Sequence, residues 1–266
     1  MQKIHPTAIV HPNARIGDLV EIGPFSVIED DVDIGPGTVV GSYCFIHSGA
    51  RIAKNVRIFH GSVVAGPPQD LKYAGEKTEL FIGEDTVIRE FCTLHRGTTY
   101  SYKTVLGGHC LLMAYSHVAH DCIIGDNVIL ANSVQLGGHS IIDDYAIIGG
   151  GALIHQFCRV GAHSIMSGGS ATNKDIPPFV KAGHYPAQYV GVNTVGLRRR
   201  GFTPEAVHNI QDVYRAIYLS GMNVSQALEH VKGNFNMTPE VLLIIRFIEV
   251  STRGILRGNR GVSSVE

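Results

Sequence analysis

A six-residue repeat of aliphatic side chains constrains the fold of this chain of 266 residues more than any other feature. Stepping by six from Ile4 to Met166 meets 28 positions, and 25 of them hold an aliphatic residue or methionine. The residue four places further on is usually small, as at Ala8 and Ala152. Hexapeptide repeats are typical of a parallel β-helix, in which both positions face inward and three repeats form one coil. The sequence therefore predicts a mainly β fold, a triangular prism of about nine coils.

Two segments break the repeat, over residues 66–80 and about 96–109, and both are rich in Gly, Pro, Tyr or Lys. We interpret them as loops that leave the prism. Loops on a rigid scaffold are where binding and catalytic residues concentrate, so these two segments are candidate parts of a functional site.

The repeat does not extend into the last third of the chain, where helix signals take its place. Thr203 and Thr238, each followed by proline and glutamate, are typical helix N-caps, and apolar residues follow them at helical spacing. A shorter helix is expected over residues 223–231. The sequence thus predicts two domains: a β-helix over residues 1–196 and an α-helical domain over residues 197–266.

Composition argues against several classes of protein. The formal charge is −1, and the 9 basic and 6 acidic side chains of residues 197–266 are too even to indicate nucleic-acid binding. No stretch approaches the roughly 18 apolar residues of a membrane span, and the N-terminus lacks a signal-peptide pattern. The cysteines all fall at the small inward position, which predicts free thiols and a cytoplasmic protein. They are Cys44, Cys92, Cys110, Cys122 and Cys158.

Eleven of the 14 histidines lie within residues 4–171, and none occupies an inward position of the repeat. Residues 18 apart stand above one another on adjacent coils, so polar side chains from three coils gather on one outer stripe. They surround two glycines, Gly137 and Gly138. The members of the stripe are His117, His120, Asp121, His139, His155 and Gln156.

This stripe holds a candidate general base and a candidate oxyanion donor. His120 is a candidate general base because imidazole titrates near working pH, and Asp121 is a candidate to orient it. Neighbours in a strand point in opposite directions, so this pair requires a turn. Gly138, one coil away, is a candidate to donate its backbone N–H to an oxyanion. No serine or cysteine nucleophile is placed with the group, since Cys122 faces inward, which favours direct attack by a substrate hydroxyl.

Two other interpretations stay open on these residues alone. Three histidines on a β-helix can bind zinc between subunits, as in hexapeptide-type carbonic anhydrases. A prism can also serve as a non-enzymatic trimeric scaffold, although a scaffold has no need of a histidine stripe.

Several segments are more specific than the repeat. They are PPQDLKYAG (67–75), TLHRGT (93–98), LLMAYSHVAHDC (111–122), IIGGGALIHQFCRVGAH (147–163), GVNTVGLRRRGF (191–202) and STRGILR (251–257). In these segments the chain closely resembles the UDP-N-acetylglucosamine acyltransferases of lipid A biosynthesis. The resemblance runs from Ile4 to the region of Arg257.

The resemblance implies a left-handed β-helix that assembles as a homotrimer, with active sites between neighbouring prisms. It implies transfer of an (R)-3-hydroxyacyl group from the phosphopantetheine arm of acyl carrier protein to the 3-hydroxyl of UDP-N-acetylglucosamine. His120 matches the general base of this family and Gly138 its oxyanion-hole amide. No cofactor, metal ion, nucleic acid or membrane insertion is expected.

The resemblance also assigns residues to the acceptor sugar and the cleft. Asp70 and Lys72 match loop residues that hold the glucosamine unit, and Gln69 lies beside them. His95 is expected to help bind phosphate. The cleft is expected to be lined by His117, His139, His155 and Gln156.

Nucleotide contacts are expected from Asn193, Arg199 and Arg200. Two arginines suit a diphosphate, because the guanidinium fork binds phosphate oxygens in pairs. Val195 departs from the family pattern, which usually has an acidic residue there.

Met166, Gly168 and Gly169 occupy the region that measures acyl length in this family. Glycine leaves room for a long chain, and each further buried methylene is worth about 0.8 kcal/mol, so we predict acyl groups of about 12 carbons or more.

Overall fold

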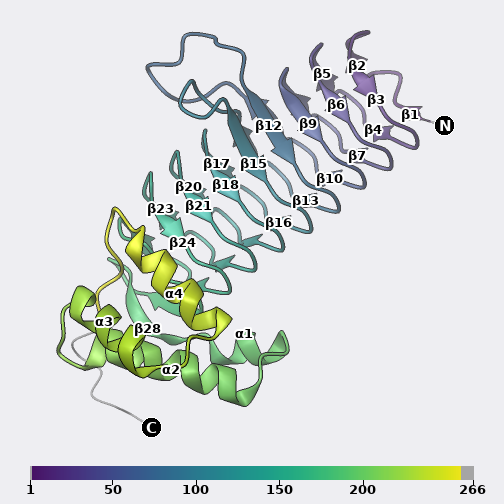
Figure 1. The fold of residues 1–266 in the computed structure, drawn as a ribbon. Helices are drawn as coiled ribbons and strands as arrows, with labels where there is room; N and C mark the ends of the chain where they lie inside the picture. Colours follow the sequence, from purple (N-terminus) through teal and green to yellow (C-terminus); the bar gives the residue numbers. More distant parts are fainter. Residues whose placement is uncertain (1, 259–266) are drawn as a thin grey trace.

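The computed structural model describes residues 2–258, so the last eight residues of the predicted helical domain lie outside the described part of the chain. The chain forms a long prism of stacked coils with helices packed at its C-terminal end (Figure 1). The three faces of the prism are sheets that we name A, B and C. The predicted parallel β-helix with a C-terminal helical domain is confirmed.

Each sheet takes every third strand of the β-helix. Sheet A contains β1 (Lys3–Ile4), β4 (Glu21–Ile22), β7 (Val39–Val40), β10 (Arg57–Ile58), β13 (Val87–Ile88), β16 (Leu111–Leu112), β19 (Ile129–Leu130), β22 (Ile147–Ile148), β25 (Ile165–Met166), β27 (Val180–Gly183) and β28 (Gln188–Val192). Sheet B contains β2 (Ile9–Val10), β5 (Val27–Ile28), β8 (Phe45–Ile46), β11 (Val63–Gly66), β14 (Thr93–His95), β17 (His117–Val118), β20 (Gln135–Leu136), β23 (Leu153–Ile154) and β26 (Ala171–Thr172). Sheet C contains β3 (Arg15–Ile16), β6 (Asp33–Ile34), β9 (Ala50–Ile52), β12 (Glu79–Ile82), β15 (Lys103–Leu106), β18 (Ile123–Ile124), β21 (Ile141–Ile142) and β24 (Arg159–Val160).

Strand partners on adjacent coils are 18 residues apart, and this spacing grows by 12 and then by 6 where two loops are inserted. The first loop covers residues 67–78, between β11 and β12, close to the predicted segment. The second is shorter than predicted. Because β15 begins at residue 103, the loop covers residues 96–102 instead of 96–109.

Aliphatic residues of the repeat fill the interior of the prism. Val118 and Ile124, on either side of His120 and Asp121, are 0% and 1% exposed. All five cysteines are buried free thiols, as their inward position predicted. Removal of this apolar surface from water holds the coils together, so the polar residues of the outer stripe are not needed for the core.

The chain turns at the edges of the prism through residues with positive φ. On the B–C edge, which follows the strands of sheet B, these residues include Asp121 (φ 58°), His139 (φ 61°) and Phe157 (φ 64°). On the C–A edge they include Tyr145 (φ 60°) and His163 (φ 57°). This left-handed conformation is uncommon for residues other than glycine, and it directs the side chain away from the path that a strand would give it.

The C-terminal part begins with the β27–β28 hairpin, which extends sheet A, and continues into helices. These are α1 (Thr194–Arg199), α2 (Pro204–Leu219), α3 (Val224–Asn234) and α4 (Pro239–Glu249). Thr203 and Thr238 cap α2 and α4 by accepting backbone N–H groups, as predicted. Asn223 caps α3 in the same way, a cap that was not predicted. The predicted domain boundary after residue 196 falls inside α1, so the helical part starts earlier than expected.

Two buried side chains fix the helices to the prism. Asp175 is 1% exposed and accepts hydrogen bonds from Ser251 Oγ at 2.6 Å and from the Arg159 N–H at 2.8 Å. The Tyr214 hydroxyl donates to the carbonyl of Pro178 at 2.5 Å. Among residues 2–258, no helix has both the length and the apolar composition to cross a bilayer.

Candidate active site

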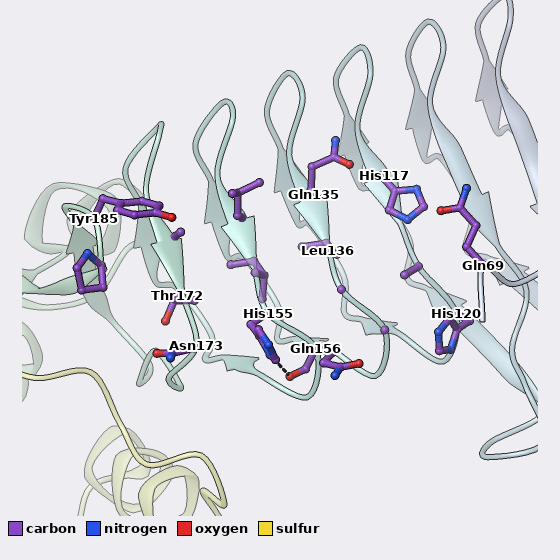
Figure 2. A pocket seen from close by; sticks show the side chains of 17 residues that line it. Gln69, His117, His120, Gln135, Leu136, His155, Gln156, Thr172, Asn173 and Tyr185 are labelled. Carbon is purple, nitrogen blue, oxygen red and sulfur yellow. Dashed lines mark hydrogen bonds between the residues drawn. The ribbon is translucent and has the colours of Figure 1, made fainter. Parts of the chain in front are cut away.

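A groove of about 690 Å³ runs along the outer face of sheet B. It crosses β17, β20 and β23 and ends at β26 and the β27–β28 turn (Figure 2). Six residues predicted from the sequence line it: Gln69, His117, His120, Gly138, His155 and Gln156. The sequence did not predict its C-terminal end, which is formed by Ala171, Thr172, Asn173, Tyr185 and Pro186.

His120 and Asp121 form a hydrogen-bonded pair in the turn that follows β17. The left-handed conformation of Asp121 brings its carboxylate back toward the preceding residue, which provides the turn that the pairing requires. Oδ2 of Asp121 lies 2.8 Å from Nδ1 of His120. Within residues 2–258, Nε2 of His120 has no hydrogen-bond partner, so it can exchange a proton with a ligand in the groove, the arrangement of an oriented general base.

Gly138 lies across the next rung from the imidazole of His120. A Cβ atom at position 138 would lie 2.7 Å from Cε1 and 2.8 Å from Nε2 of His120, closer than real Cβ contacts. Glycine is therefore required for His120 to occupy this position. Among residues 2–258, no carbonyl or side chain accepts a hydrogen bond from the Gly138 N–H, so this donor is available to a ligand.

The carboxylate of Asp121 is held by the loop over residues 96–102, a role that the sequence did not predict. Thr98 donates to it from its backbone N–H at 3.1 Å and from Oγ1 at 2.7 Å, and Ser101 donates from its N–H at 3.2 Å and from Oγ. Burial alone would raise the pKa of Asp121. Hydrogen bonds from Ser101, His120 and Thr98 outweigh it, and the pKa lies below its ordinary value. The carboxylate is thus ionised at neutral pH.

His139 of the stripe and the neighbouring His95 lie behind the groove instead of lining it. His139 stacks on Phe157, and its Nδ1 lies 3.9 Å from Oδ2 of Asp121. Burial lowers the pKa of His139 although the nearby carboxylate opposes this. His95 is 6% exposed and lies edge-on to His117 with ring centroids 5.0 Å apart. Burial and the neighbouring histidines lower the pKa of His95 to about 4, so it is neutral at pH 7.

The loop over residues 67–78 brings Gln69 to the groove, while Asp70 and Lys72 lie at the surface of the loop. The carboxylate of Asp70 accepts a hydrogen bond from the Lys72 N–H at 3.0 Å, which shapes the turn. Arg96 connects the two loops, because its guanidinium donates to the hydroxyl of Tyr73 at 2.8 Å. The groups predicted to hold the acceptor sugar are thus tied to the loop that holds Asp121.

The predicted nucleotide-binding residues lie on a different edge of the prism. Asn193 caps α1, and its Nδ2 donates to the carbonyl of His163 at 2.9 Å on the C–A edge. The guanidinium of Arg200 lies 5.3 Å from the ring centroid of Tyr145 on the same edge, and Arg199 is exposed nearby. One chain therefore does not bring these residues to the groove beside His120.

The predicted acyl-length residues lie outside the lining of the groove. Met166 is 0% exposed inside the prism, so direct contact between Met166 and a ligand on the outer face is ruled out. Gly168 and Gly169 form an exposed turn on the edge between sheets A and B, just before β26. Within one chain, the end of the groove is bounded instead by Tyr185 and Pro186.

A metal site was the main competing interpretation of the histidines. Within residues 2–258, His120, Asp121 and His139 each offer a ligand atom, and these atoms lie within 4.8 Å of one another. However, Nδ1 of His120 and Oδ2 of Asp121 already share a hydrogen bond, and loop residues occupy the remaining carboxylate positions. The geometry fits a base and its orienting carboxylate better than a set of free ligands.

The prism, its outer groove and its helical end together define a hexapeptide-repeat transferase. The model of the bacterial transferase hexapeptide (six repeats) matches residues 103–138. The model described as UDP-N-acetylglucosamine O-acyltransferase, domain 2, matches residues 175–256.

Full-length relatives narrow this class. An acyl-(acyl-carrier-protein)–UDP-N-acetylglucosamine O-acyltransferase from Pseudomonas savastanoi is 45% identical over 97% of this chain and 100% of its own length. The solved UDP-N-acetylglucosamine acyltransferase from Bacteroides fragilis is 45% identical, with a TM-score of 0.94 over 95% of this chain and 99% of that one. A solved relative from Acinetobacter baumannii is 42% identical, with a TM-score of 0.93 over 96% of this chain and 99% of that chain. The chain belongs to the UDP-N-acetylglucosamine O-acyltransferase family, and its prism is the left-handed β-helix expected from the resemblance.

Proposed function

We propose that this chain transfers an (R)-3-hydroxyacyl group from acyl carrier protein to the 3-hydroxyl of UDP-N-acetylglucosamine, the first step of lipid A biosynthesis. The observation that carries the proposal is the position of His120, paired with Asp121 at 2.8 Å and lying across the bare backbone of Gly138. Family membership supports the same substrates, which the names of the relatives state. Neither the zinc hydratase nor the scaffold interpretation gains comparable support.

The geometry supports a direct transfer without a covalent enzyme intermediate. The sugar hydroxyl attacks the thioester carbonyl carbon while Nε2 of His120 takes its proton, and Asp121 stabilises the resulting imidazolium through Nδ1. The oxyanion of the tetrahedral intermediate accepts the Gly138 N–H. Collapse breaks the C–S bond, and His120 returns the proton to the departing thiolate. Among the described residues that line the groove, none is a serine or cysteine that would serve as a nucleophile.

The site is proposed to be completed by a neighbouring subunit of a homotrimer. Asn193, Arg199 and Arg200 lie on the C–A edge, whereas His120 lies on the B–C edge. A diphosphate near His120 would meet these residues only if another copy presented its C–A edge to the groove. A neutral-pH sedimentation experiment that finds an active monomer would contradict this arrangement.

The remaining substrate and compartment assignments follow from the same proposal. Acyl carrier protein, with its phosphopantetheine-linked acyl group, is the donor, and no cofactor or metal ion takes part. Five buried free cysteines fit a reducing, cytoplasmic environment. Metal analysis of the purified active protein tests whether a metal ion takes part. One bound zinc ion per chain, required for turnover, would overturn the metal-free reaction.

The acyl length stays a prediction of about 12 carbons or more. Within one chain, the groove that would hold the acyl group ends at Tyr185 and Pro186. A series of hydroxyacyl carrier proteins of different length, offered together with UDP-N-acetylglucosamine, identifies the preferred donor by mass spectrometry of the product. A clear preference for ten carbons contradicts the predicted length without affecting the reaction class.

The reaction itself is tested with His120→Ala. We expect kcat to fall by about a thousandfold, within the range for a lost general base, while the thermal midpoint stays near that of the wild type because His120 is not in the core. His208→Ala, an exposed histidine of α2, is the matched control. Undiminished turnover by His120→Ala would remove the base assignment, and a wild-type protein that forms no acylated sugar would remove the proposed function.

A further inference from the structure

The loop over residues 96–102 makes its closest polar contacts with a catalytic carboxylate. Four groups of this loop donate to Asp121: the backbone N–H and the hydroxyl of Thr98, and the backbone N–H and the hydroxyl of Ser101. Thr98 is 7% exposed and Asp121 is 4% exposed, so water does not compete freely for these contacts. A buried carboxylate that accepts several hydrogen bonds is fixed in orientation as well as in charge.

The two hydroxyls act on different oxygens of the carboxylate. Oγ1 of Thr98 lies 2.7 Å from Oδ2, the same oxygen that lies 2.8 Å from Nδ1 of His120. Oγ of Ser101 donates to Oδ1, which also accepts the N–H groups of Thr98 and Ser101. Rotation of the carboxylate about its last bond would break contacts on both oxygens. The loop therefore determines where Oδ2 lies, and Oδ2 determines the orientation of the imidazole.

The backbone of Asp121 is held separately from its side chain. The Asp121 N–H donates to Oγ1 of Thr104 at 2.8 Å, and Thr104 is buried in β15. Loss of a hydroxyl at position 98 or 101 is thus expected to release the carboxylate while the turn itself stays in place.

We infer that Thr98 and Ser101 are positioning residues of this enzyme, which act on the acyl-transfer step by holding the Asp121 carboxylate against His120. The inference rests on the proposed function. In this inference the loop over residues 96–102 orients the general base, whereas the loop over residues 67–78, with Gln69 at the groove, faces the ligand. Thr98 has the larger effect of the two, because its hydroxyl donates to Oδ2, the oxygen that also contacts His120. Without that hydroxyl, Oδ2 keeps one backbone contact, from the Thr98 N–H at 3.2 Å, whereas Oδ1 keeps two backbone donors when Ser101 loses its hydroxyl.

The experiment compares Thr98→Val, Ser101→Ala, Thr98→Ser and Thr99→Val in steady-state kinetics with UDP-N-acetylglucosamine and a hydroxyacyl carrier protein. Thr99 is the matched control, because it is exposed and, within the described chain, its side chain makes no hydrogen bond to Asp121. We expect Thr98→Val to lower kcat by about tenfold or more, since hydrogen bonds to charged groups are worth at least that factor. Both KM values stay unchanged, and Thr98→Ser restores most of kcat.

A double variant separates positioning from a general structural role. If Thr98 acts through Asp121, adding Thr98→Val to Asp121→Asn lowers kcat no further, whereas independent damage to the fold multiplies the two losses. Thermal unfolding of each variant shows whether it folds. If Thr98→Val does not fold, Ser101→Ala decides, with a smaller expected fall in kcat at an unchanged thermal midpoint.

Three results would overturn the inference. The first is a kcat for folded Thr98→Val equal to that of Thr99→Val, and the second is a loss confined to KM. The third is a multiplicative loss in the double variant. A wild-type chain that transfers no acyl group would overturn the proposed function and this inference together, whereas an active wild type with an undiminished Thr98→Val overturns the inference alone.

Discussion

His139 and His163 occupy the same left-handed turn position on two different edges of the prism, with φ of 61° and 57°. Each ring stacks nearly parallel on an aromatic ring of an adjacent rung. His139 stacks on Phe157 at a centroid distance of 4.2 Å and an angle of 3°, and His163 stacks on Tyr145 at 4.8 Å and 5°. The stacked histidine is therefore a consequence of the repeat and is not specific to the active site.

The charges beside the two histidines differ. Oδ2 of Asp121 lies 3.9 Å from Nδ1 of His139, whereas the cation of Arg200 stands near His163. Burial lowers the pKa of both rings. For His139 the Asp121 carboxylate opposes this fall. For His163 the Arg200 guanidinium adds to it, by more than the Asp144 carboxylate opposes it, and the pKa falls to about 4. The repeat thus gives both histidines the same position, and the balance of neighbouring charges distinguishes them.

The largest test of this comparison removes the carboxylate from the B–C edge. We expect Asp121→Asn to lower kcat by about 100-fold or more, because an amide no longer stabilises the imidazolium or fixes its tautomer. Asp144→Asn, a carboxylate that faces His163 on the C–A edge, is the matched control and leaves kcat unchanged. Equal losses from the two variants would show that the edges do not differ in function.

The second test uses acid unfolding to compare the same edges. The unfolded chain binds a proton at His163 near pH 6.5, whereas the folded chain does so only near pH 4. The free energy of unfolding is therefore highest above pH 6.5 and falls as the pH drops from 6.5 to 4, by about 1–2 kcal/mol for this half-buried ring, which solvent partly screens. His163→Phe keeps the stacked ring and lacks the titrating group, so its urea-unfolding free energy falls less between pH 6.5 and 4. Parallel curves for the two proteins would contradict the buried, neutral state of His163.

Much of the fold could be predicted, because each coil repeats the same constraint. Counting by 18 placed His120 across from Gly138 without any knowledge of the turn, since residues on adjacent coils share one register. The helix caps Thr203 and Thr238 were equally local signals. Information that recurs in every coil, or that is local to a few residues, is visible in a single sequence.

The rest depended on segments that do not repeat. The path of the loop over residues 96–102 is set by its own hydrogen bonds, so nothing in the repeat indicated that Thr98 and Ser101 reach Asp121. Val105 pairs with Ile123 in sheet C, so residues 103–106, which were predicted to be loop, form strand β15. The distance between Arg200 and His120 was equally invisible, because it depends on which edge α1 packs against.

A third test removes the cation from the C–A edge. Arg200→Met removes the cation beside His163, so we expect the pKa of His163 to rise from about 4 toward its ordinary value, as followed by NMR titration of the ring protons. Arg198→Met, which changes an exposed arginine of α1, the helix that Arg200 caps, is the control. Within the proposed trimer, Arg200→Met also raises KM for the nucleotide sugar, by about tenfold for one lost ionic contact. An unchanged His163 titration would mean that burial alone sets its pKa.

The smallest test removes the stacked rings themselves. Phe157 and Tyr145 are 39% and 37% exposed, so Phe157→Leu and Tyr145→Leu remove stacked rings of similar exposure, one from the rung after His139 and the other from the rung before His163. Each stack is worth about 1 kcal/mol beyond its apolar contact, so both variants should lose a similar, small unfolding free energy. Only Phe157→Leu should lower kcat, because the ring it loses holds His139 beside the Asp121 carboxylate. If both variants keep full kcat, the stack on the B–C edge stabilises the prism and does not contribute to catalysis. The functional difference between the two edges would then rest on Asp121 and the loop that holds it.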